Sequence, residues 1–116
     1  MSEFVQLLEF HKKYVEIPQA EYRRNDKLAV TKEDRKELYK NTKKALVEGL
    51  AELNKLKLSP VEKNGISNYR KFFKEAIRAC DAGIQGKEAK SLRIMHIADN
   101  YARKYEAILY RIGAMY

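Results

Sequence analysis

The last thirty residues of the chain carry an unbroken apolar repeat, and this repeat constrains the fold more than any other feature. Along a main stripe, apolar residues recur at alternating steps of four and three, and a second stripe follows one position later at steps of seven. The main stripe contains Ile94, Ala98, Tyr101, Tyr105, Ile108, Ile112 and Met115, and the second contains Met95, Ala102, Leu109 and Tyr116. Such a pattern is typical of a helix that buries a wide face against other helices. We therefore predict a long helix from about Lys87 to the end of the sequence.

Length and composition predict a single helical domain. The chain has 116 residues, of which 45% are hydrophobic and 34% charged, and it contains only five glycines and two prolines. It is too apolar for disorder, and two separate domains would each be too small to bury a good core. We expect residues 1–116 to form one all-α domain, a four-helix bundle with mostly antiparallel neighbours and long second and fourth helices.

The first helix is expected to start after Ser2 and to end at about Ile17, because Pro18 disfavours a helical residue before it. Residues 18–30 then form a connector that contains Tyr22. The buried stripe of this helix is predicted to contain Phe4, Leu7, Leu8, Tyr14 and Val15.

Thr31 is predicted to cap the long second helix, with Asp34 in its first turn, and the helix is expected to run to Leu58. Gly49 falls on its apolar face, where a neighbouring helix can approach closely.

A start signal for the third helix follows, with Ser59 as cap, Pro60 at the first helical position and Glu62 completing a capping box. Gly65 is expected to interrupt the helix, with Ser67 capping it again. Gly83 and Gly86 are expected to end it. Its core stripe is predicted to contain Ile66, Tyr69, Phe73, Ile77, Cys80 and Ile84.

Residues that could support catalysis or bind a metal are few. His11 and His96 are the only histidines, and Cys80 is the only cysteine. No Glu-x-x-His or Cys-x-x-Cys pair occurs, so the sequence predicts neither a metal site nor a cofactor. Cys80 lies on an apolar stripe and is expected to act as a small core residue. We predict a protein that is not an enzyme; the alternative, an enzyme, would depend on His96.

The charge of the chain indicates a binding surface. Its 24 lysines and arginines against 16 acidic residues give a net charge of +8, and no basic tail carries the excess. On the third helix, Arg70, Lys71, Lys74 and Arg78 fall within about 100° of one another on a helical wheel, and only Asp81 interrupts the arc. On the second helix, Lys36, Lys40 and Lys43 lie beside the apolar face. Two tyrosines, Tyr22 and Tyr110, are candidates for stacking on unpaired bases.

These features favour a basic accessory protein that contacts the backbone of nucleic acid, with RNA or single-stranded DNA preferred over duplex. A helix-turn-helix at Gly65 would need a scaffold helix in residues 60–64, which is too short. The alternative is a protein-interaction module, such as an inhibitor, an adaptor or a small subunit of a larger assembly, that docks on an acidic partner. The wide apolar face of the predicted C-terminal helix could also mediate a homo- or hetero-oligomer.

The sequence also indicates where the protein works. Its N-terminus lacks a secretory signal, and no apolar run approaches the roughly 18 residues of a membrane span. A single cysteine fits a reducing compartment. We therefore expect no membrane partner and a cytoplasmic location.

Overall fold

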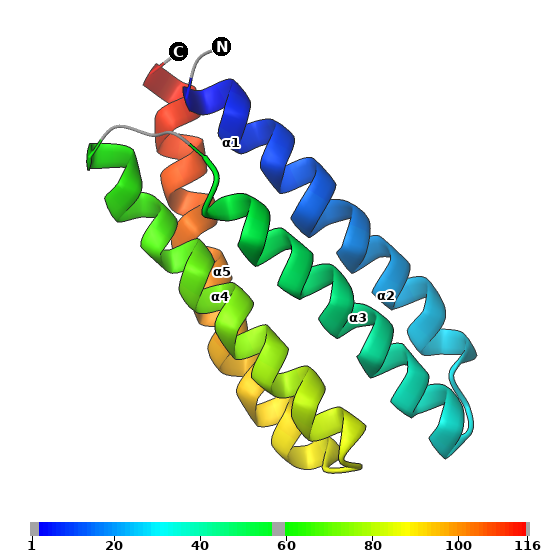
Figure 1. Ribbon diagram of the computed structural model, residues 1–116. Coiled ribbons are helices and arrows are strands. Elements are labelled where there is room, and N and C mark those ends of the chain that lie inside the picture. The colour runs from blue at the N-terminus through cyan, green and yellow to red at the C-terminus, as the bar shows by residue number, and fades with distance from the viewer. Residues whose placement is uncertain (1–2, 57–59, 116) are drawn as a thin grey trace.

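The computed structural model describes the backbone of residues 3–56 and 60–115, and the side chains of residues 5–56, 66–107 and 109–111. In chain order its elements are α1 (Glu3–His11), the π-helical turn η1 (Lys12–Glu16), α2 (Ile17–Leu28), α3 (Lys32–Leu53), α4 (Pro60–Ile84) and α5 (Glu88–Met115). The first three form one continuous rod, so the described chain is a bundle of four helical rods (Figure 1).

Consecutive rods run antiparallel, which confirms the predicted all-α bundle. Helix α4 packs on α3 and on α5, while the N-terminal rod packs mainly on α3 and touches α5 through α1. The bundle measures 46 × 22 × 21 Å. Helix α3 has 22 residues and α5 has 28, so both are long as predicted, and α4 with 25 residues is long as well. No helix in the described part of the chain is long and apolar enough to span a membrane.

The N-terminal rod corrects the first helix prediction, because it does not end at Ile17 and residues 18–28 are not a connector. In η1 the backbone hydrogen bonds of the helix span five residues instead of four. The Ile17 N–H, for example, donates to the carbonyl of Lys12. Pro18 then lies in the first turn of α2, the position where a helix tolerates a residue without an N–H. The wider turn thus lets the helix pass through proline and continue to Leu28.

The rod's buried residues are close to the predicted set. Leu7 and Val15 are buried, and Leu8 and Tyr14 are half-buried. Phe10, which the predicted stripe omits, is also buried. The Ser2 cap and the Phe4 side chain lie outside the described residues.

Helix α3 begins as predicted. The Asp34 N–H donates to Thr31 Oγ1 at 3.0 Å, and the Thr31 N–H donates back to the Asp34 carboxylate at 3.4 Å, which completes a capping box. Its end comes earlier than the predicted Leu58. After Leu53, which is fully buried, the Lys55 N–H donates to Glu52 O and the helix tightens into a turn.

Helix α4 starts at Pro60 as predicted but runs without a break to Ile84, so the interruption at Gly65 and the second cap at Ser67 are wrong. Ile66 and Tyr69 are each only 2% exposed. Burial of such residues outweighs the cost of about 1 kcal/mol that glycine imposes inside a helix. The Ser59 cap and the Glu62 side chain lie outside the described residues.

Two glycines set the distance between α3 and α4. A Cβ atom built on Gly49 would lie 2.7 Å from Phe73 Cε1, and one built on Gly83 would lie 2.5 Å from Tyr39 Cγ. Gly49 therefore allows the close approach predicted for it. Gly83 lies inside the last turn of α4 and allows a second close approach.

Gly86 ends α4 as predicted. It has a φ of 80°, and the N–H groups of Gly86 and Lys87 donate to the carbonyls of Gly83 and Ala82. This is the Schellman arrangement, which requires a left-handed residue after the helix.

Helix α5 buries its two apolar stripes wherever the side chains are described. Ile94, Ala98, Ala102 and Tyr105 are buried, and Met95, Tyr101 and Leu109 are half-buried and pack against the core. The stripe residues Ile108, Ile112, Met115 and Tyr116 have side chains outside the described set. The described part of the wide face is thus occupied by the bundle itself.

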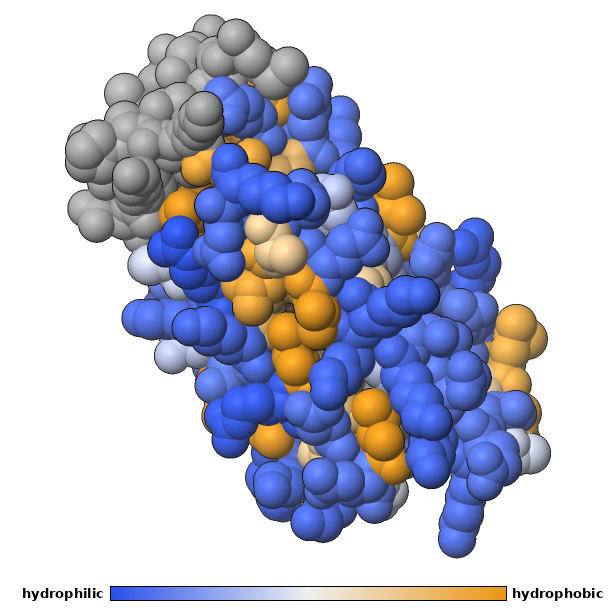
Figure 2. Space-filling view, in the orientation of Figure 1, coloured by the Kyte–Doolittle hydropathy of each residue, from blue (hydrophilic) through white to orange (hydrophobic). Residues whose placement is uncertain are grey.

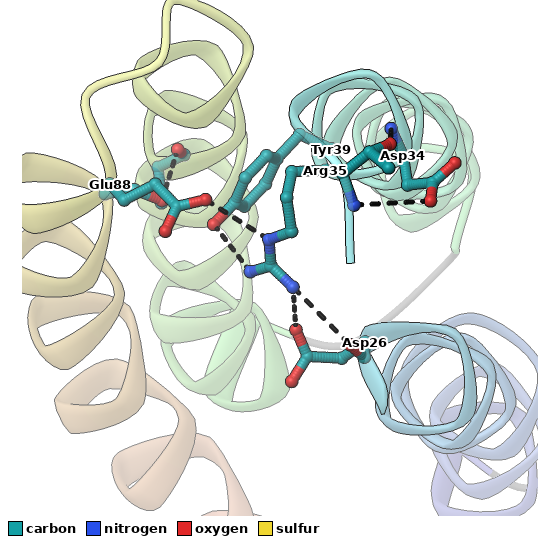
Figure 3. A network of polar contacts seen from close by, with 8 residues as sticks. Asp26, Asp34, Arg35, Tyr39 and Glu88 are labelled. Carbon is teal, nitrogen blue, oxygen red and sulfur yellow. Dashed lines mark hydrogen bonds and ion pairs between the residues drawn. The ribbon is translucent and has the colours of Figure 1, made fainter. Parts of the chain in front are cut away.

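Arg35 ties three helices together at the end of the bundle opposite the termini (Figure 3). Its guanidinium pairs with Asp26 of α2 and, at 3.2 Å, with Glu88 of α5, and it donates to the hydroxyl of Tyr39 at 3.3 Å. These contacts, the hydrogen bond to Asp26 above all, raise the pKa of the guanidinium. The side chains are partly exposed, so the contacts act chiefly to fix the positions of the helix ends.

Candidate nucleic-acid interface

The four basic residues predicted on the third helix form one ridge along the solvent side of α4. Lys71, Lys74 and Arg78 are exposed and Arg70 is half-buried, while Phe73 on the opposite side of the helix is fully buried. We call Arg70, Lys71, Lys74 and Arg78 the α4 ridge. Helices α3 and α5 flank α4, so the ridge lies on a broad face and does not project as a single helix.

Most of the charge on this ridge is not neutralised by acids. Arg70 donates from Nε to the neutral Oδ1 of Asn54 at 3.0 Å. Lys74 makes no ion pair with any described residue, and neither does Lys71. Where side chains are described, Arg78 is the one ridge residue that pairs with an acid, Glu75, at 2.8 Å.

The lysines predicted on the second helix lie beside the ridge but are displaced along the bundle. Lys36 and Lys40 are exposed, and Lys43 pairs with Asp81 of α4 at 2.7 Å. Gly83 lies against Tyr39, so Lys36 and Lys40 lie near the C-terminal turns of α4. The ridge begins at the other end, where Arg70 contacts Asn54 just after α3. Figure 2 shows hydrophilic residues covering most of the face made by α3 and α4, around apolar patches in its middle.

The two tyrosines predicted to stack on bases do not lie beside the ridge. Tyr22 belongs to α2 and is half-buried, and it lines a groove of about 330 Å³ against α3 and a cleft of about 220 Å³ that reaches the core. Burial, the largest of several causes, raises the pKa of Tyr22 to about 12. Tyr110 is 78% exposed on α5, but it lies about 180° around the helix from Tyr101, which faces α4.

Tyr101 and Lys104 are potential binding residues that the sequence reasoning missed. The Nζ atoms of Lys71, from α4, and Lys104, from α5, lie 5.6 and 5.4 Å from the centroid of the Tyr101 ring. In the sequence, Tyr101 belongs to the main apolar stripe of the last helix. Its position at the edge of that stripe, three residues before Lys104, is the sequence feature that indicates a contact between the two side chains.

A polar cluster inside the bundle was also missed. His11 is only 8% exposed, and its Nδ1 lies 3.4 Å from the hydroxyl of Tyr69. Tyr69 stacks on Tyr105 with ring centroids 3.9 Å apart, and the buried hydroxyl of Tyr105 has no hydrogen-bond partner among the described residues. Burial is the main cause that raises the pKa of both tyrosines. The interior of the bundle is therefore not wholly apolar.

Burial also lowers the pKa of His11 from its ordinary value of 6.5, although the carboxylates of Glu16 and Glu106 act in the opposite direction. Glu16 Oε1 lies 3.6 Å from Nε2 of the histidine. The cluster joins the N-terminal rod, α4 and α5, and its rings pack edge to face and stacked. Such packing indicates a structural role in the core.

The remaining candidates for chemistry lie apart from one another. Cys80 is buried as predicted, and burial raises the pKa of its thiol to about 12. His96 is exposed on the polar side of α5, next to the exposed Asp99. Within the described part of the chain, no three His, Cys, Asp or Glu side chains gather closely enough to hold a metal ion.

Comparisons with protein-family models, curated proteins and solved structures find no match to this chain. The continuous α4 contains no turn at Gly65, so a helix-turn-helix cannot form there.

Proposed function

We propose that this protein is a non-enzymatic accessory protein that binds the sugar-phosphate backbone of nucleic acid through the α4 ridge. A net charge of +8 favours polyanionic partners in general. The observation that carries the proposal is that Arg70, Lys71 and Lys74 have no acidic partner among the described side chains. Lysines and arginines without an acidic partner can neutralise phosphates, and this releases the counterions condensed on the nucleic acid.

The shape of the ridge favours backbone contact over the reading of base sequence. A recognition helix must project far enough to enter the major groove, whereas α4 lies between two neighbours along its length. The lysines of the α3 flank, Lys36 and Lys40, extend the cationic face along the bundle. A partner would follow this face without a strong preference for sequence.

Binding to mixed-sequence single-stranded and duplex oligonucleotides across a salt series tests the proposal. Four phosphate contacts predict a slope of log K against log salt of about −3 for single strands. A triple variant with Arg70→Glu, Lys71→Glu and Lys74→Glu should abolish binding.

A second triple variant, with Lys12→Glu, Arg24→Glu and Lys27→Glu, is the matched control. It lowers the net charge equally, but its exposed residues lie on the N-terminal rod and not on the solvent side of α4. It should bind at least ten times more tightly than the ridge variant. Equal losses in both variants would mean that net charge alone matters, and no binding at low salt by the unmodified protein would refute the proposal.

A protein partner with an acidic surface is the second candidate. Leu92, Ile97 and Tyr110 of α5 are 64%, 45% and 78% exposed, and exposed apolar side chains beside basic ones suit a protein interface or an oligomer. Capture of an acidic protein, lost in the ridge variant and combined with no nucleic-acid binding, would favour this candidate. In either case the buried, unpaired Cys80 suits a reducing compartment such as the cytoplasm.

A further inference from the structure

Tyr101 lies where the α4 ridge meets α5. Its ring is half-buried and packs against the core cluster, so its position is fixed by the bundle. Lys71 of the ridge reaches the ring from α4, and Lys104 reaches it from α5. An aromatic ring thus lies close to two cations that belong to different helices.

This arrangement occurs once on the described ridge. Among the described aromatic side chains, Tyr101 is the one whose ring lies beside the cation of a ridge residue, and it stays partly exposed. Neighbouring rings such as Phe72, Phe73 and Tyr105 are buried in the core. A ligand lying along the ridge would therefore meet one aromatic surface, at Tyr101.

We propose that Tyr101, Lys71 and Lys104 form a subsite for one unpaired nucleobase and the phosphates beside it, so that the preferred ligand is single-stranded nucleic acid. This inference rests on the proposed function and assigns its ligand class. Aromatic side chains stack on bases of any sequence because every base has a π-face. The two ammonium groups, on flexible stems, exchange a weak contact with the ring for contacts to phosphate.

Duplex nucleic acid cannot use this subsite, because each base in a duplex is already stacked between its neighbours. Duplex would therefore engage the lysines and arginines alone. The subsite needs an unpaired base and does not depend on the sugar, so RNA and DNA single strands are separate arms of the test, probed with oligo(U) and oligo(dT). A preference for one of them would report on contacts beyond the subsite.

The first experiment compares Tyr101→Leu with Tyr110→Leu, each measured against oligo(dT), oligo(U) and a DNA duplex. Tyr101→Leu should weaken binding to the single strands by about 10-fold, within the range of about 5- to 150-fold for loss of one stacked base. Its affinity for duplex should change less than twofold. Tyr101→Phe, which keeps the ring, should bind the single strands as well as the unmodified protein. Unchanged single-strand affinity, or an equal loss for duplex, would overturn the subsite.

A spectroscopic measurement covers the case in which Tyr101→Leu unfolds the protein. The chain contains no tryptophan, so a Tyr101→Trp variant carries a single reporter. Oligo(dT) should quench its fluorescence by stacking, whereas a Tyr110→Trp variant should keep its signal. Binding seen by anisotropy without quenching at position 101 would refute the subsite.

The two proposals fail in different ways. If the unmodified protein binds no nucleic acid, the proposed function fails and the subsite fails with it. If the ridge variant loses binding while the Tyr101 variants keep theirs, the backbone interface stands and only the stacking subsite is wrong.

Discussion

Gly83→Ala is a sharp test of the α3–α4 packing, because alanine is normally the better residue in a helix. Relative to glycine it gains about 1 kcal/mol of helix stability. At this position, however, the added Cβ would lie 2.5 Å from both Cγ and Cδ2 of Tyr39 and 2.6 Å from Cδ1. Cγ is bonded directly to the Cβ of Tyr39, so the ring cannot move aside by a small rotation.

The size of the effect follows from two opposing terms. Tyr39 is only 5% exposed, and its hydroxyl is held by Arg35, so relief requires the helices to separate or the tyrosine to leave its site. Overpacking of this kind costs about 1–3 kcal/mol. After the gain in helix propensity, we expect Gly83→Ala to lower the free energy of unfolding by up to about 2 kcal/mol and Tm by up to about 8 °C.

Urea unfolding followed by circular dichroism, with an unchanged m-value, would measure this loss. A double-mutant cycle with Tyr39→Ala isolates the clash: without the ring, Gly83→Ala should become stabilising by up to about 1 kcal/mol. Destabilisation of the same size in both backgrounds would refute the reasoning, and so would a stabilising effect of Gly83→Ala alone.

Two further predictions concern buried titratable groups. The unfolded chain protonates His11 near pH 6.5, whereas the folded protein does so only at lower pH, so the unfolded state binds more protons between these values and stability should fall as pH drops below 6.5. Tm measured from pH 7 to pH 5.5 should fall more steeply for the unmodified protein than for His11→Gln, and parallel curves would contradict the assignment. Cys80, with its raised pKa and 1% exposure, should resist thiol reagents in the folded protein at neutral pH and react fully in denaturant. Rapid labelling without denaturant, followed by mass spectrometry, would show that the thiol is accessible.

Much of the fold could be predicted because local signals and burial agree along most of the chain. The Thr31 cap, the Pro60 start and the left-handed Gly86 each depend on a few adjacent residues. Pro18 and Gly65 were misread because both are breakers only in an ordinary, weakly packed α-helix. A wider turn before Pro18 and a buried face beside Gly65 overcome those local costs.

The candidate site divides in the same way. The α4 ridge follows from helical periodicity, since charged residues opposite an apolar stripe must face solvent. Contacts between helices, such as Lys43 with Asp81 or Lys71 with Tyr101, depend on how far one helix slides along another. That register is set by the fit of glycines against rings, which periodicity does not encode. The burial of His11 could have been predicted, because His11 lies four residues from both Leu7 and Val15 and so shares their side of the helix.

The widened turn at Lys12–Glu16 also determines how the second half of the N-terminal rod is oriented. A wide turn absorbs one additional residue, and in an ordinary helix one residue corresponds to a rotation of about 100°. If ordinary α-helical hydrogen bonds ran through the whole N-terminal rod, a different side of α2 would therefore be directed toward α3. The number of residues between His11 and Ile17, as much as the residues of α2 themselves, thus selects which surface of α2 is covered and which is left to solvent.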